Sequence, residues 1–162
     1  MPAIKKVSDS SVTMRQLVMP NDTNPHNTIF GGTVMSWIDM AAAMVAERHS
    51  NKNVVTVHVD DITFLSPIRV GDHVCVKAQV NYVGKTSILI GVKVIAENPQ
   101  SGDSRHTTSA YLTFVALNDV GRPTEVPGLE VITEEEKRRF SEGALRVEQQ
   151  KEKAVKKAKA KS

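Results

Sequence analysis

One aspartate in this 162-residue chain has almost entirely apolar neighbours in its helical segment. Asp39 falls within a segment of helical period, and its neighbours three and four positions away are Met35, Ser36, Ala42 and Ala43. An ionised carboxylate in such surroundings is costly unless a polar group faces it, and burial would raise its pKa. A carboxylate of this kind can serve as general base or nucleophile. The residues alone leave open a structural role at a subunit interface or against a loop.

Two adjacent glycines, Gly31 and Gly32, stand where the same helix is expected to begin. Glycines there leave backbone N–H groups uncovered at the positive end of the helix dipole, which suits an oxyanion hole for a carbonyl oxygen. Asp39 lies about two turns further on, so a substrate carbonyl could sit in a cleft between two subunits that each contribute one element. The alternative is that the glycines only permit a tight turn into the helix.

Other candidate sites are weaker. The turn Gly84-Lys85-Thr86-Ser87 ends like a phosphate loop, but Gln79 occupies the position of the first glycine, so a P-loop is excluded and a modest phosphate-binding patch remains. Five residues could suggest a metal but lack ligand spacing and are interpreted as edge or surface residues: His58, Asp60, Asp61, Asp72 and His73. No metal site and no G-x-S-x-G serine nucleophile are predicted.

Composition places the chain among ordinary globular proteins, and its charge is unevenly distributed. The sequence pI is about 9.0, yet Glu148 to Ser162 carry a net charge of +4, and residues 1–147 hold 15 basic against 16 acidic residues. The basic pI therefore belongs to a tail and does not indicate a DNA-binding body. Cys75 stands alone, which excludes a disulfide framework. Met1 to Arg15 show no signal peptide and no apolar run suits a membrane helix, so a cytoplasmic protein is expected.

One helix and a meander of strands are predicted to position these residues. The apolar face of the helix comprises Val34, Trp37, Ile38, Ala41, Ala42 and Val45. Methionines and alanines fill the other side, so the helix is expected to be buried on most sides and to end near 47–51. Segments of period two follow at 54–59, 61–65, 73–83, 86–96 and 105–117, after a first strand at 12–19. The pattern predicts an α+β domain with an antiparallel sheet wrapped round the helix.

A second helix is predicted near the C-terminus. Thr133 and Glu136 form a capping-box pattern, and the helix would carry 137–150 and fade into a solvated or frayed Lys/Ala tail.

Several blocks together resemble the hotdog-fold acyl-CoA thioesterases, most closely the bacterial YciA/YkhA-type acyl-CoA hydrolases. These blocks are Met19-Pro20-Asn21-Asp22-Thr23-Asn24, Ile29-Phe30-Gly31-Gly32, Met35-Ser36-Trp37-Ile38-Asp39, residues 66–72 and residues 82–87. The resemblance runs from about residue 10 to 125. It divides the chain into an N-terminal extension (1–10), a hotdog acyl-CoA hydrolase domain (11–125) and a C-terminal helix with a Lys-rich tail (126–162).

The resemblance implies a hydrolase of acyl-CoA in fatty acid metabolism, with no cofactor because coenzyme A is part of the substrate. It assigns catalytic roles to Asp39, Asn24, Gly31 and Gly32, and CoA binding to Gly84, Lys85, Thr86 and Ser87. It also implies a homo-oligomer, at least a dimer and commonly a homohexamer built as a trimer of dimers, with CoA between subunits. No specific nucleic acid partner and no membrane insertion are expected. At Thr28 the sequence departs from relatives that carry Asp or Asn there.

The alternative is a non-catalytic acyl-CoA-binding regulator. Such regulators usually carry a separate DNA-binding domain, and residues 1–11 are too short for one. A hotdog dehydratase is also less favoured, because the catalytic histidine expected on the helix is absent.

Overall fold

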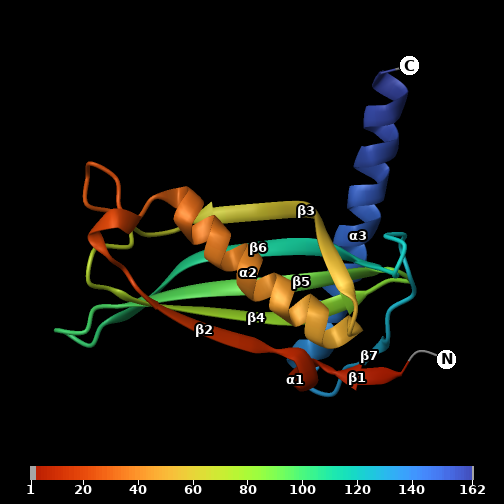
Figure 1. Ribbon diagram of the computed structural model, residues 1–162, viewed down its shortest axis with the longest axis horizontal. Coiled ribbons are helices and arrows are strands. Elements are labelled where there is room, and N and C mark those ends of the chain that lie inside the picture. Colours follow the sequence, from red (N-terminus) through yellow and green to blue (C-terminus); the bar gives the residue numbers. More distant parts are fainter. Residues whose placement is uncertain (1–2, 162) are drawn as a thin grey trace.

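A five-stranded antiparallel sheet forms the centre of the computed structural model, which describes residues 3–161. Its strands, in spatial order, are β2 (Val12–Leu17), β4 (His73–Val83), β5 (Ser87–Glu97), β6 (Ser104–Leu117) and β3 (Asn53–Phe64). Helix α2 (Gly31–Ser50) crosses one face of the sheet, and helix α3 (Glu134–Ala160) lies on the other side and extends beyond it (Figure 1). The α+β hotdog arrangement predicted from the sequence is confirmed.

One face of helix α2 packs against the sheet and forms the helical side of the core. Val34, Ala41 and Val45 are fully buried against the sheet, because the apolar positions recur on one helix face as the sequence predicted. The helix ends at Asn51, whose left-handed backbone (φ 55°) directs its N–H to the carbonyl of Glu47.

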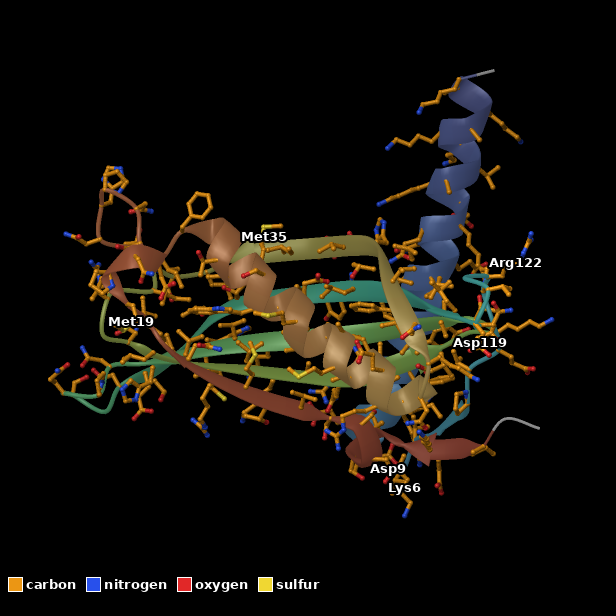
Figure 2. All side chains as sticks on the ribbon, viewed as in Figure 1. Lys6, Asp9, Met19, Met35, Asp119 and Arg122 are labelled. Atoms are coloured by element: carbon orange, nitrogen blue, oxygen red, sulfur yellow. The ribbon has the colours of Figure 1, made fainter. Side chains whose placement is uncertain are left out.

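The expectation that α2 is buried on most sides is wrong for the single chain. Met35, Met40 and Met44 are 40–48% exposed on its other side. Figure 2 labels Met35 on the first half of this helix. An apolar helix face left uncovered by its own chain is a surface that a second chain can cover.

Helix α3 begins at the predicted capping box. The Glu136 N–H donates to Thr133 Oγ1 and the Thr133 N–H donates to Glu136 Oε2, both at 3.0 Å. The helix then packs Phe140 against Tyr82, with ring centroids 4.9 Å apart. A side chain at Gly143 would collide with Tyr82, since a Cβ there would lie 2.7 Å from the Tyr82 Cβ.

The C-terminal part of α3 is helical, whereas the sequence predicted a helix that fades into a frayed tail after residue 150. The helix continues to Ala160, because the lysines, alanines and glutamate of this segment are good helix formers even though 151–161 are exposed.

The predicted strands at 54–59 and 61–65 are one strand, β3, interrupted by two register shifts. At the second shift Asp61 adopts φ 50°, a conformation that aspartate tolerates better than most residues. Arg146 of α3 forms ion pairs with Asp61 at 2.7 Å and Asp60 at 3.5 Å, and its guanidinium lies 3.6 Å from the centre of the Tyr111 ring. These two aspartates therefore hold α3 on the sheet.

Asp72 is not a surface residue, which corrects the sequence interpretation. It is 5% exposed, accepts the Arg69 N–H at 2.9 Å and forms an ion pair with Arg105 at 2.9 Å. The carboxylate is buried because it organises the turn before β4 and has a cation to neutralise it. No group of His, Cys, Asp and Glu among the described residues is arranged to hold a metal.

Four short elements complete the described part of the chain. Strand β1 (Ile4–Lys6) pairs in parallel with β7 (Gly128–Glu130), and helix α1 (Val7–Ser10) follows β1 directly. Figure 2 labels Lys6 and Asp9 at this corner, where the Lys6 N–H donates to Asp9 Oδ2 at 2.8 Å. A 3-10 turn, η1 (Pro20–Asp22), follows β2. Within residues 3–161, no helix is both long and apolar enough to traverse a bilayer.

Candidate active site

The loop before α2 is folded around the side chain of Asn24. Its Oδ1 accepts the His26 N–H at 2.9 Å, and its Nδ2 donates to Thr28 Oγ1 at 3.0 Å. The backbone closes the same loop, since the Asn24 N–H donates to the Thr28 carbonyl at 2.9 Å. Thr28 is thus the residue that holds the Asn24 side chain in place.

The start of α2 presents free backbone donors. Phe30 is the N-cap and its side chain makes no capping hydrogen bond. In the described part of the chain, the N–H groups of Gly31 and Gly32 have no hydrogen-bond partner, as expected of the first residues of a helix. A Cβ on Gly32 would lie 2.7 Å from the Phe30 ring, so glycine keeps these donors open beside an aromatic side chain that is itself 60% exposed. The arrangement can bind an oxyanion.

An apolar cavity of about 370 Å³ adjoins Gly31. It is lined by Thr28, Ile29, Gly31, Phe64, Leu65, Ser66, Pro67 and Ile68. Its size and lining suit an aliphatic chain next to the free N–H groups.

Asp39 is held by a residue that the sequence reasoning missed. Thr56 of β3 donates its hydroxyl hydrogen bond to Asp39 Oδ1 at 2.9 Å. Both residues are exposed in the single chain, so the expected burial of Asp39 is not found there. The hydrogen bond fixes the carboxylate while its second oxygen keeps free lone pairs.

The described residues do not bring the whole predicted set together within one chain. Gly32 and Asp39 are seven residues apart on one helix, which separates them by about 10 Å along its axis. No hydrogen bond joins Asn24 to Asp39. The glycine donors and the Asp39 carboxylate of one chain are therefore too far apart to contact the same carbonyl group.

The Gly84–Ser87 turn is an ordered hairpin connection between β4 and β5. The Gly84 N–H donates to the Ser87 carbonyl at 2.9 Å, and the Lys85 carbonyl accepts from Val126 N–H at 2.9 Å. The Lys85 side chain is exposed and forms no ion pair with a described residue. Figure 1 shows this turn at the end of the sheet away from the start of α2, so it lies apart from the Gly31 and Gly32 donors.

Comparison with known proteins agrees with the geometry. The model of the Thioesterase superfamily matches residues 26–102. The acyl-CoA thioester hydrolase YkhA of Bacillus subtilis is 42% identical over 135 residues, which cover 83% of this chain and 78% of that protein.

Two solved structures are similar over almost the full length. The acyl-CoA hydrolase of Staphylococcus aureus, in complex with butyryl coenzyme A, coenzyme A and coenzyme A disulfide, superposes with a TM-score of 0.90, is 36% identical and covers 97% of this chain and 96% of that one. Forms of the same enzyme with alanine in place of one aspartate, one asparagine or one threonine superpose with TM-scores of 0.90 to 0.92. An apo-hexameric acyl-CoA thioesterase gives a TM-score of 0.90 at 39% identity, covering 94% of this chain and 97% of that one.

Proposed function

The chain belongs to the acyl-CoA thioester hydrolases of the Thioesterase superfamily, and we propose that Asp39 is the residue that carries its chemistry. The enzyme hydrolyses an acyl-CoA to a free carboxylic acid and CoA. The observation that carries the assignment is the Thr56–Asp39 hydrogen bond, which orients one carboxylate on an otherwise apolar helix face. The replacement of one aspartate, one asparagine and one threonine in the Staphylococcus aureus relative supports a trio of the types found here at Asp39, Asn24 and Thr56.

Two routes use the same residues. In the first, Asp39 takes a proton from water as the water oxygen attacks the thioester carbonyl carbon. In the second, Asp39 attacks that carbon itself, the C–S bond breaks to form a mixed anhydride, and water then hydrolyses the anhydride. In both, the Gly31 and Gly32 N–H groups stabilise the negative charge on the carbonyl oxygen, and the CoA thiolate leaves and is protonated. Asn24 positions the water or the thioester, and neither route needs a cofactor.

A pair of copies completes the site. Strand β3 is an edge of the sheet with Val55, Val57 and Val59 exposed, beside the exposed methionines of α2. Pairing of two β3 edges about a two-fold axis would continue the sheet and set two α2 helices antiparallel. If the axis crosses α2 near Ser36, Gly32 of one copy lies beside Asp39 of the partner subunit.

We base the proposed larger assembly on the assemblies of the relatives. Hexameric structures among them support three such pairs in a homohexamer. In this assembly two subunits bind one acyl-CoA. One subunit holds the thioester with its glycines, and another holds the CoA phosphates with its Gly84-Lys85-Thr86-Ser87 turn. We also propose that the protein is cytoplasmic. We propose that the hotdog domain spans residues 11–125, between an N-terminal extension and the C-terminal helix with its tail.

The test is Asp39→Asn, which keeps the side chain's size and its hydrogen bond from Thr56 but removes the base and nucleophile. Its kcat on a panel of acyl-CoAs should fall by about 100-fold or more. The matched control is Asp119→Asn, at a position in the loop between β6 and β7. Hydrolysis by Asp39→Asn within a few-fold of the parent would disprove the assignment.

A further inference from the structure

The outer face of the sheet, opposite α2, carries a cavity that the proposed hydrolysis does not use. Its volume is about 450 Å³, and it lies between β2, the middle of β4, β5 and β6, and the first turns of α3. None of the residues assigned to the thioester or to CoA lines it. A hollow of this size is sufficient for a small organic ligand.

A row of polar side chains crosses the floor of this cavity. The strand register pairs Thr13 with Lys77 and Lys77 with Lys93. It also pairs Lys93 with Ser109 on the next strand. Directly paired residues share one face, and their neighbours Ala78 and Val92 point the other way into the core. Four adjacent strands therefore present hydroxyl, ammonium, ammonium and hydroxyl groups in one line.

The two lysines are placed at a cost to the fold. Like charges directly opposite each other in an antiparallel pair are destabilising. Neither Lys77 nor Lys93 forms an ion pair with any described residue, so no described carboxylate lies in direct contact with either ammonium group. A bound anion between the two ammonium groups would turn this repulsion into attraction.

Helix α3 adds two more cations at the rim. Arg138 and Arg139 line the cavity, and Glu142 is the single carboxylate among its described lining residues. Glu142 accepts from Arg138 at 3.2 Å, while Arg139 is paired at 2.6 Å with Glu135 outside the cavity. The lining as a whole thus has four cations against one anion.

A buried amide without a partner lies at the same place. Asn81 lines the cavity, is 6% exposed, and its Oδ1 is buried with no hydrogen-bond partner among the described residues. It sits at a register shift of β4 and lies close to the next strand, since a Cβ on Gly91 would lie 2.5 Å from Asn81 Nδ2. An unpartnered buried acceptor is costly, and a ligand with an N–H or O–H donor would satisfy it.

From these observations we propose that the outer-face cavity binds an organic phosphate that carries hydroxyl or amino donors, the chemistry of a nucleoside diphosphate. Lys77 and Lys93 hold the phosphoryl oxygens between them, with Thr13 and Ser109 on either side. Arg138 and Arg139 neutralise the remaining charge. Asn81 accepts a hydrogen bond from the nucleoside part. The site is independent of the thioester chemistry, and its test does not require turnover.

The test uses the full-length protein and two probes, uridine diphosphate and inorganic pyrophosphate, with the melting temperature and calorimetric titration as readouts. A ligand that binds the folded state raises the melting temperature with its concentration. Uridine diphosphate should do so for the parent and for Lys156→Gln, a matched lysine on the exposed end of α3. In Lys77→Gln and Lys93→Gln its Kd should rise by about tenfold or more. Without ligand, both variants should melt no lower than the parent, because the repulsion is relieved.

Asn81→Ala distinguishes the contact with the nucleoside part of the ligand from the contacts with its phosphates. It should weaken uridine diphosphate toward the affinity of pyrophosphate and leave pyrophosphate binding unchanged. Three results would each overturn the proposal: no binding by the parent at millimolar ligand, binding that survives in both lysine variants, or binding that is lost in Lys85→Ala instead, which would place the phosphates at the CoA turn. The hydrolysis assay of Asp39→Asn is read separately, so failure of either proposal leaves the other measurable.

Discussion

The hydroxyl of Thr56 and the carboxylate of Asp39 are joined by a 2.9 Å hydrogen bond between β3 and α2. It links the edge strand of the sheet to the central helix. The bond leaves one carboxylate oxygen of Asp39 with its full capacity to accept a proton or to attack carbon. In the proposed hydrolysis, Thr56 is therefore a positioning residue for Asp39.

Replacing Thr56 tests that role. Thr56→Val keeps the shape of the side chain but removes the donor, and the loss of one hydrogen bond to a charged group should lower kcat by about tenfold with little change in KM. Thr56→Ser keeps the hydroxyl and should restore most of kcat. A purely structural role predicts the opposite grouping, with both variants equally impaired and both melting at lower temperature.

Lys85 tests the assignment of the β4–β5 turn to CoA. Its ammonium is exposed and has no ion-pair partner in the described chain, so Lys85→Ala should remove the proposed phosphate contact without disturbing the fold. Steady-state kinetics should show KM for acyl-CoA rising more than kcat falls. Lys156→Ala serves as the comparison and should leave KM unchanged. An unaltered KM in Lys85→Ala would remove Lys85 from the CoA site.

The buried ring of His49 should make the free energy of unfolding depend on pH. The ring is fully buried near the end of α2, its Nε2 donates to the Pro127 carbonyl at 2.8 Å, and its Nδ1 has no partner among the described residues. Burial lowers the pKa of His49 below its usual value of 6.5, outweighing the opposing hydrogen bond to Pro127. The unfolded chain then binds a proton at a higher pH than the folded one.

The stability that depends on neutral His49 is therefore complete above pH 6.5 and is lost as the pH falls from there through the folded-state pKa. Urea denaturation at a series of pH values should show the free energy of unfolding falling over this range. His49→Gln retains a donor for the Pro127 carbonyl and should flatten the decline, whereas His26→Gln, at an exposed position, should not. An equal pH dependence in His49→Gln would show that other groups cause it.

Local signals in the sequence predicted most of the fold. The apolar period of α2, its end near Asn51 and the capping box at Thr133 are each set by residues close in sequence. The period of two, rich in Val, Ile and Thr, and the break at Gly84-Lys85 likewise predicted β4 with the bounds that the structure shows. Such features depend on neighbours within about four residues, which a single sequence displays directly.

The parts that could not be predicted depend on distant pairings. Thr56 reaches Asp39 only because β3 lies beside α2 in one register, and no local pattern distinguishes Thr56 from the other threonines. Asp72 was misplaced because its partner Arg105 is 33 residues away. The exposure of Asp39 and of the α2 methionines was also missed, since periodicity shows that a face is apolar but not which chain covers it.

The separation of Gly32 and Asp39 along α2 has a genetic consequence. An allele without the carboxylate at position 39 and an allele with a bulky residue at position 32 would each encode an inactive enzyme. Expressed together, and paired as proposed above, they would form mixed pairs in which one site combines the intact glycine of one polypeptide with the intact aspartate of the other. Two defective genes would thus complement each other within a single heteromeric protein.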